Sequence, residues 1–141
     1  MASKFWFDQE KDWKFYYDEG KSYLKTCKKL LIKRGPFDNE FIYNLSILAG
    51  ERLVLGTLLS YDYIPASSSL LGMLKEAEEK FTVDNNLFDG AKYIYKFQPF
   101  CSLEVEDFKI PDDSEIKKVV DYFLSIENLC EKNLCSSAMV K

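Results

Sequence analysis

Two long stretches of helical periodicity, separated by a Gly-Pro pair, constrain the fold of this chain more than any other feature. From about Phe7 to Arg34 the chain contains no proline, and apolar residues recur at the spacing of one face of an amphipathic helix. Gly35-Pro36 then predicts the end of this helix, because glycine suits the turn after a helix and proline cannot continue one. The predicted buried stripe is Trp13, Tyr16, Tyr17, Gly20, Tyr23, Leu24, Cys27, Leu30 and Leu31.

A second helix is predicted directly after this turn. Asp38 is a natural N-cap, and Pro65 disfavours helical backbone at the residue before it, which predicts an end near Tyr63. Gly50 and Gly56 lack side chains, so they predict a place where another helix packs closely. The predicted apolar stripe is Phe41, Ile42, Leu45, Leu48, Ala49, Arg52, Leu53, Leu55, Gly56 and Leu59.

Two further long helices and one short helix are predicted in the rest of the chain. The serines at 67–69 supply hydroxyl caps for a third helix that runs to about residue 81. The stretch 87–97 reads as a short helix. Residues 98–113 contain two prolines and few periodic cues, which predicts an irregular loop. Asp112, Asp113 or Ser114 then caps a last helix that ends near residue 134.

These elements predict an all-α fold and a single domain over residues 1–141, with a frayed tail at 136–141. Long helices with one apolar face each, joined mostly by short turns, are typical of an antiparallel up-and-down four-helix bundle. The short extra helix and the irregular loop come before the last helix of this bundle.

The sequence contains no histidine, and this excludes much of the usual chemistry of enzymes. Ser-His-Asp and Cys-His arrangements are impossible without it, and so are the Glu-x-x-His pairs of di-metal bundles. The four cysteines, at positions 27, 101, 130 and 135, form no C-x-x-C pair. The glycines are scattered and form no phosphate-binding loop. We therefore expect no catalytic residue, no metal site and no cofactor.

The charge is unevenly distributed along the chain. The net charge is −4, but residues 1–35 carry nine Lys or Arg against five acids. A basic first helix on an acidic body fits an anionic partner, a second copy of the chain, or a solvated helix face. An aromatic content of 16% suggests a subunit interface, although tyrosines also occupy half-exposed positions. No signal peptide or 20-residue apolar run is evident, so we expect a cytoplasmic location and no membrane contact.

Arg52 stands out because it interrupts the apolar stripe of the second predicted helix, next to Glu51. A charged group on a buried stripe must find a partner or reach water with its tip. One interpretation is an ion pair across the bundle or a dimer interface, with an acid on the first helix. The other is an anion-binding site.

The second and third predicted helices resemble those of the HEPN family. The matching runs are Ala49–Leu59 (AGERLVLGTLL), the Ile64-Pro65 turn, and Ser68–Leu71 (SSLL). Residues 93–99 (YIYKFQP) are similar to an Arg-Tyr-Pro segment before the last helix of that family. The pattern covers roughly residues 8–134. The resemblance implies a four-helix bundle, a homodimer, and a minimal nucleotidyltransferase as partner, as in a toxin–antitoxin pair.

The resemblance also implies ligand-binding residues. Glu51 matches the family's glutamate on the second helix, Arg52 the basic residue after it, and Lys96 loosely an arginine, while Tyr93 opens the later segment. Catalytic members are metal-independent ribonucleases that use an Arg followed closely by a His. This chain has no His, and Ser68 stands where many members have another one.

Two functional hypotheses follow from the sequence. The first is a non-catalytic HEPN-like bundle that homodimerises and binds a protein partner, such as a minimal nucleotidyltransferase, or a nucleotide-like anion such as a nucleotide or RNA. The alternative is a divergent ribonuclease or nucleotide-processing enzyme without a histidine base that uses Arg52, Lys96, Tyr93 or Glu51, with Tyr and Lys side chains as acid and base. A purely structural subunit is a third possibility.

Overall fold

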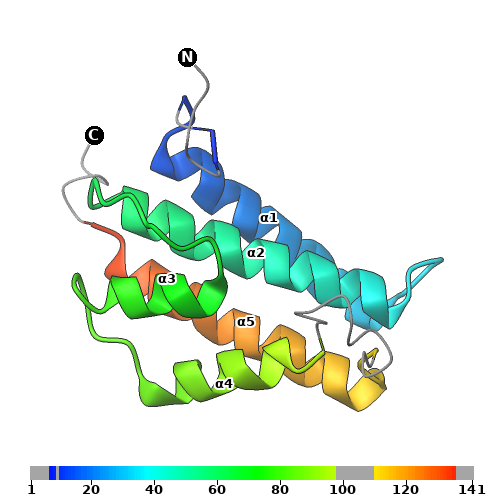
Figure 1. Ribbon diagram of the computed structural model, residues 1–141. Coiled ribbons are helices and arrows are strands. Elements are labelled where there is room, and N and C mark those ends of the chain that lie inside the picture. The colour runs from blue at the N-terminus through cyan, green and yellow to red at the C-terminus, as the bar shows by residue number, and fades with distance from the viewer. Residues whose placement is uncertain (1–6, 9, 98–109, 136–141) are drawn as a thin grey trace, which may run out of the picture.

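The computed structural model describes residues 7–8, 10–97 and 110–135. Within these ranges the chain forms α-helices and no strand, which confirms the predicted all-α class (Figure 1). The helices are α1 (Trp13–Ile32), α2 (Asn39–Leu59), α3 (Leu70–Ala77), α4 (Asn85–Tyr95) and α5 (Asp113–Asn133).

Helix α2 is the centre of the molecule. Its backbone lies close to α1, α3 and α5, whereas the backbone of α4 lies close only to α3 and α5 and meets α2 through side chains, as where the Tyr43 hydroxyl donates to Ile94 O. Helices α1 and α4 therefore lie at opposite edges, with α2 and α5 between them (Figure 1). A residue on α4 and a residue on α1 cannot belong to one compact site in this arrangement.

Side-chain caps set the starts of three helices where the sequence predicted them. The Asp38 carboxylate accepts a hydrogen bond from the backbone N–H of Phe41, and the Ser69 hydroxyl accepts one from Gly72. Asp112 and Glu115 form a reciprocal capping box at the start of α5. Each contact satisfies an N–H group that the first helical turn leaves without a partner.

Other predicted boundaries are wrong by a few residues. Helix α1 begins at Trp13 and not near residue 7, because the Asp12 side chain caps it by accepting from Phe15 N. Helix α3 ends at Ala77 and not near residue 81, and α4 covers 85–95 and not 87–97. Most of the predicted irregular loop (98–109) and the predicted frayed tail (136–141) lie outside the described residues.

Glycines allow α1, α2 and α5 to approach one another closely. A Cβ atom on Gly56 would lie 2.8 Å from the backbone N of Tyr17 on α1, and one on Gly20 would lie 2.8 Å from Ala49 O on α2. Gly50 faces the ring of Phe123 on α5. The prediction that Gly50 and Gly56 mark close helix packing is confirmed.

The predicted buried face of α2 is only partly correct. Phe41, which was placed in the stripe, is 40% exposed, and Leu45, Leu48, Arg52 and Leu59 are only partly buried. Since α2 lies close to three other helices, it is buried on most of its circumference rather than along one stripe. The buried residues are Ile42, Tyr43, Ser46, Ile47, Ala49, Gly50, Leu53, Val54, Leu55, Gly56, Thr57 and Leu58.

Among the described helices, α2 alone is long and apolar enough to cross a membrane. This differs from the expectation that no segment approaches such a length. The core helix of a globular protein passes the same test, and about two-thirds of this one (67%) is buried by its neighbours.

Candidate functional site

Arg52 forms an ion pair with α1, as one of the two sequence interpretations expected. Its Nε lies 3.1 Å from Glu19 Oε1, and its guanidinium carbon lies 5.4 Å from the centre of the Tyr16 ring. The two charged atoms are shielded from solvent but are not aligned as a hydrogen bond. The contact is therefore a partly buried ion pair, supported by the face of an aromatic ring.

This ion pair lies within a half-exposed apolar surface, which we call the outer face. On α2 the face follows Phe41, Leu45, Leu48 and Arg52, at the four- and three-residue spacing of one side of a helix. On α1 it follows Phe15, Glu19 and Tyr23. The Arg52–Glu19 contact shows that the two rows lie side by side.

Aromatic side chains mark both ends of the outer face. Phe37 and Phe41 stack with ring centres 4.6 Å apart, and these two side chains are 42% and 40% exposed. Phe15, also 42% exposed, lies on the half of α1 that packs near Gly56, at the other end of α2. Half-exposed aromatic side chains in one surface mark a site of protein contact.

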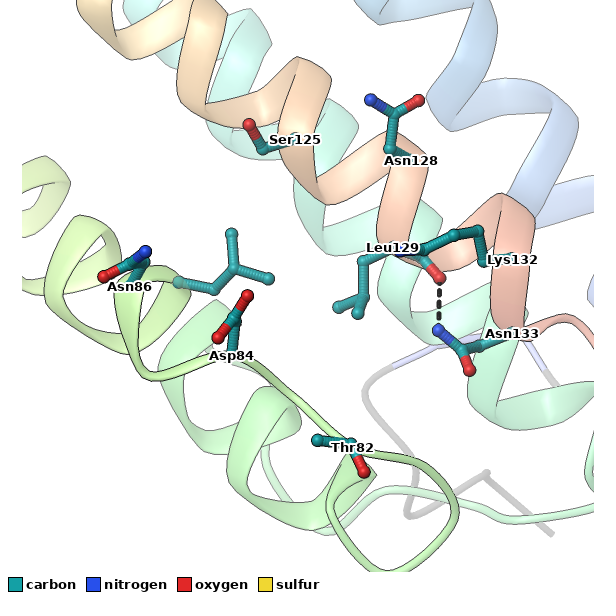
Figure 2. A pocket seen from close by; sticks show the side chains of 9 residues that line it. Thr82, Asp84, Asn86, Ser125, Asn128, Leu129, Lys132 and Asn133 are labelled. Atoms are coloured by element: carbon teal, nitrogen blue, oxygen red, sulfur yellow. Dashed lines mark hydrogen bonds between the residues drawn. The ribbon is translucent and has the colours of Figure 1, made fainter.

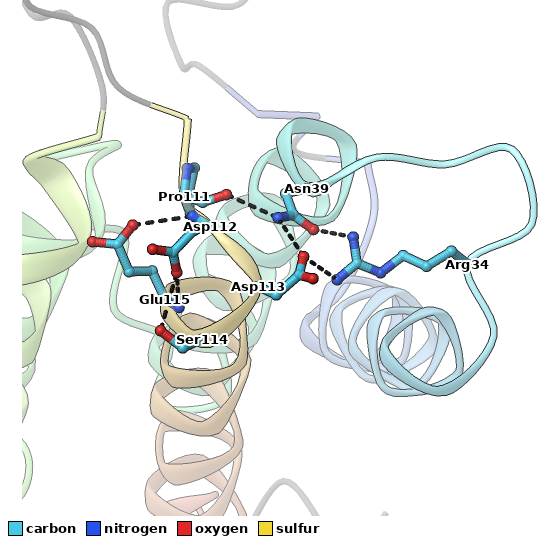
Figure 3. Close-up of polar contacts among 7 residues, drawn as sticks. All are labelled: Arg34, Asn39, Pro111, Asp112, Asp113, Ser114 and Glu115. Carbon is cyan, nitrogen blue, oxygen red and sulfur yellow. Dashed lines mark hydrogen bonds and ion pairs between the residues drawn. The ribbon is translucent and has the colours of Figure 1, made fainter.

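A polar network holds the turn between α1 and α2 against α5 (Figure 3). Arg34 donates to the side-chain oxygen of Asn39, and its Nη2 lies 3.3 Å from Asp113. The Asn39 amide donates to Pro111 O at 2.9 Å and to Asp113 at 3.1 Å. These contacts therefore hold the Phe37–Phe41 end of the outer face in place.

Glu51 faces a different part of the molecule from Arg52. Burial raises its pKa to about 7, although the nearby Arg52 charge acts in the opposite direction. The Glu51 carboxylate also contributes to the raised pKa of Tyr95 on α4, behind burial as the main cause. The Tyr95 hydroxyl accepts a hydrogen bond from Leu70 N at 2.7 Å, at the start of α3. Glu51 is thus directed to the side of α2 that α3 and α4 cover.

Tyr93 and Lys96 lie at the end of α4. The Lys96 ammonium is 4.2 Å from the centre of the Tyr93 ring and 5.1 Å from that of Phe97. Phe97 is fully buried and contacts the ring of Tyr43 edge-on at 5.7 Å. Because α4 does not pack against α1, these residues do not join Arg52 in one site. Sequence reasoning did not predict the outer face, because it assigned Tyr23, Phe41, Leu45 and Leu48 to buried stripes and gave Phe15 and Phe37 no role.

A shallow basic hollow of about 440 Å³ lies between α1 and α5. Lys21 is paired there with Glu131 at 2.9 Å, while Lys25 and Lys28 form no ion pair with a described residue. Glu127 also lines the hollow and reduces its positive charge. The excess of lysine in the first 35 residues was the sequence signal for this surface.

Two of the cysteines, Cys27 and Cys130, are poor candidates for chemistry. Cys27 and Cys130 are buried, and burial raises the pKa of both thiols, to about 12 for Cys130. Cys101 lies outside the described residues. No cluster of three or more Cys, Asp or Glu within the described ranges could hold a metal ion.

Comparison with known proteins finds no family model that matches the chain, no similar curated protein and no similar solved structure. The resemblance to the HEPN family therefore stays a prediction, and so does any role of Glu51, Arg52, Tyr93 and Lys96 in binding a ligand.

Proposed function

We propose that this chain is a non-catalytic protein-binding module, an antiparallel four-helix bundle that homodimerises through the outer face. The observation that supports this most directly is the half-exposed row on α2, which the partly buried Arg52–Glu19 pair joins to α1. Interface cores are rich in aromatic residues and arginine, and this surface has both.

The outer face suits a second copy of the chain because its two ends are alike. Helices α1 and α2 run antiparallel, since Gly56 of α2 lies beside Tyr17 near the start of α1. A two-fold axis near Leu48, midway between Phe41 and the level of Phe15, would place Phe15 of one copy on the Phe37–Phe41 stack of the other. From Phe41 to the level of Gly56, beside which the Phe15 end of α1 lies, the face is about 22 Å long at the α-helical rise of 1.5 Å per residue. This length fits an interface of ordinary size.

Size-exclusion chromatography with light scattering tests the dimer. We expect a dimer at about 10 μM protein, and we expect Phe41→Asp to weaken association at least tenfold, roughly 1.4 kcal/mol, because it buries a charge in the interface. Ile32→Asp is the matched control. Ile32 is 88% exposed and lies on the lysine side of α1, outside the outer face. A wild-type chain that stays monomeric, or equal weakening by both variants, contradicts the proposal.

A further partner protein or a nucleotide-like anion belongs to the same proposal. Since Arg52 is neutralised by Glu19, the basic hollow around Lys25 and Lys28 is the better anion site. An acidic partner protein, such as the nucleotidyltransferase that the HEPN resemblance implies, would meet this hollow. Titration with ADP, followed by NMR shifts of the residues lining the hollow, tests the anion. A Lys25→Glu, Lys28→Glu variant should lose those shifts.

Glu51 favours the alternative function, a divergent ribonuclease or nucleotide-processing enzyme. A carboxyl group with a pKa of about 7 is suited to act as a general base at neutral pH. The test is incubation of the pure protein with mixed RNA, beside Glu51→Gln and Arg52→Ala forms. Cleavage by the wild type that either substitution abolishes supports the enzyme, and equal inertness of all three rejects it.

A further inference from the structure

An open polar groove lies on a side of the molecule that the outer face does not reach. It has a volume of about 730 Å³ and runs between α5 and the segment that connects α3 to α4 (Figure 2). Polar side chains form most of both walls. The lining residues are Thr82, Asp84, Asn86, Leu87, Ser125, Asn128, Leu129, Lys132 and Asn133.

One wall of the groove is a polar row on α5. Ser125, Asn128 and Lys132 follow one another at three- and four-residue spacing, so they lie along one side of the helix (Figure 2). Asn128 and Lys132 make no hydrogen bond or ion pair with any residue in the described ranges. Ser125 bonds only within its own helix, to Asp121 O at 3.4 Å. This row offers an amide, an ammonium and a hydroxyl to the groove.

The other wall is an extended segment before α4. Thr82 and Asp84 are exposed while Val83 between them is 4% exposed, the alternation of a strand at the edge of a sheet. Asp84 has extended backbone angles (φ −62°, ψ 139°), and its side chain forms no cap for α4. Within the described part of the chain, the backbone N–H groups of residues 82–84 donate to no acceptor. Such a segment is open to pairing with another extended chain.

Two leucines supply the apolar side chains that line the groove. Leu129 is 8% exposed, and Leu87 is partly buried. The Leu87 carbonyl accepts a hydrogen bond from the Tyr122 hydroxyl at 2.7 Å, which fixes the start of α4 to α5. The two walls are therefore held at a set separation, so the groove does not depend on a ligand for its shape.

We propose that this groove binds an extended peptide segment of a partner protein. The amide groups of Asn86 and Asn128 carry both donors and an acceptor, which matches the N–H and C=O of a peptide backbone. Lys132 on one wall would meet an acidic side chain, and Asp84 on the other would meet a basic one. An open polar trough suits such a chain better than a small apolar ligand, which prefers an enclosed pocket.

An array of octapeptides tests this inference without knowledge of the partner. Each peptide is a Ser-Gly repeat that carries one Glu and one Lys. Together the peptides place these two residues at every pair of positions, in both orders. We expect the wild-type protein to bind peptides of one order and spacing, and Asn128→Leu to weaken the best peptide at least tenfold. Asn44→Leu is the control, since Asn44 is exposed on α2 away from the groove. Circular dichroism confirms that each variant is folded.

Charge reversal makes the test specific for the two walls. Lys132→Glu combined with Asp84→Lys should bind peptides with the opposite order of Glu and Lys. Absence of any bound peptide, binding that Asn128→Leu leaves unchanged, or an unchanged order in the reversed variant would each overturn the inference. None of these outcomes bears on the dimer, because the groove and the outer face share no residue.

Discussion

The two sides of α2 have similar apolar composition but different surroundings. On the covered side, Gly50 and Gly56 bring α5 and α1 so close that a single methyl group has no room. On the outer face, Phe41, Leu45 and Leu48 are large, and only part of each is covered. The glycine side is fully covered within one chain, whereas the outer face is only partly covered. Apolar periodicity therefore identifies an apolar surface without telling how much of it the same chain covers.

The largest effect is expected from filling the covered side. Gly56→Ala would place a Cβ atom 2.8 Å from Tyr17 N and 2.9 Å from Trp13 O, and backbone atoms cannot rotate away as a side chain can. We expect the free energy of unfolding to fall by about 2–3 kcal/mol, because overpacking outweighs the better helix propensity of alanine.

Urea denaturation at one protein concentration measures this change. The control, Asn44→Ala, lies on the exposed surface of α2 and should change stability by no more than about 0.5 kcal/mol. A Gly56→Ala variant as stable as the wild type would show that the covered side of α2 is packed no more tightly than the outer face.

A smaller effect is expected at Glu51, on the border of the covered side. Its pKa is raised from 4.5 to about 7 in the folded protein, so the folded state holds the proton more tightly than the unfolded state. The contribution of Glu51 to the stability of the wild type should therefore fall as pH rises from 4.5 to 7. Glu51→Gln removes this loss, and we expect a gain on the order of 1–2 kcal/mol at pH 8, discounted because the carboxyl keeps some solvent contact.

The measurement is urea denaturation of both proteins at pH 4 and pH 8. The two should be equally stable at pH 4, where Glu51 is protonated in both the folded and the unfolded state. Glu79→Gln, an exposed substitution in the turn after α3, is the matched surface control. An equal difference at both pH values would argue against burial of the Glu51 carboxyl.

The smallest effect is expected at the ion pair of the outer face. The side chains of Arg52 and Glu19 are 29% and 24% exposed, so their coupling should be about 0.5–1 kcal/mol. A double-mutant cycle with Arg52→Met and Glu19→Gln measures this coupling. Repeating the cycle in the Phe41→Asp background sharpens the comparison. If a second copy covers the outer face, the Arg52–Glu19 coupling energy should be larger in the wild-type background than in the Phe41→Asp background, because burial strengthens charge interactions.

Sequence reasoning succeeded where the cause is local. Asp38 was correctly predicted as an N-cap, and so was the pairing of Arg52 with an acid on the first helix. Sequence reasoning failed where contacts among several helices determine which residues are buried. Tyr43 and Ile47 are buried although they lie off the predicted stripe, and Tyr43 owes its burial to contacts with Ile94 of α4 and with Phe97. The groove around Asn128 was not anticipated, because polar residues on a helix give no periodic signal.

By itself, the sequence determined the helical class, the capped starts of the later helices, and the absence of imidazole chemistry. These depend on neighbours within a few residues, or on composition alone. Only the tertiary structure decided which apolar residues remain half-exposed, that Glu51 and Arg52 face different parts of the molecule, and where the polar groove forms. The physical reason is that burial depends on which helices pack together, and that contact joins residues far apart in the chain.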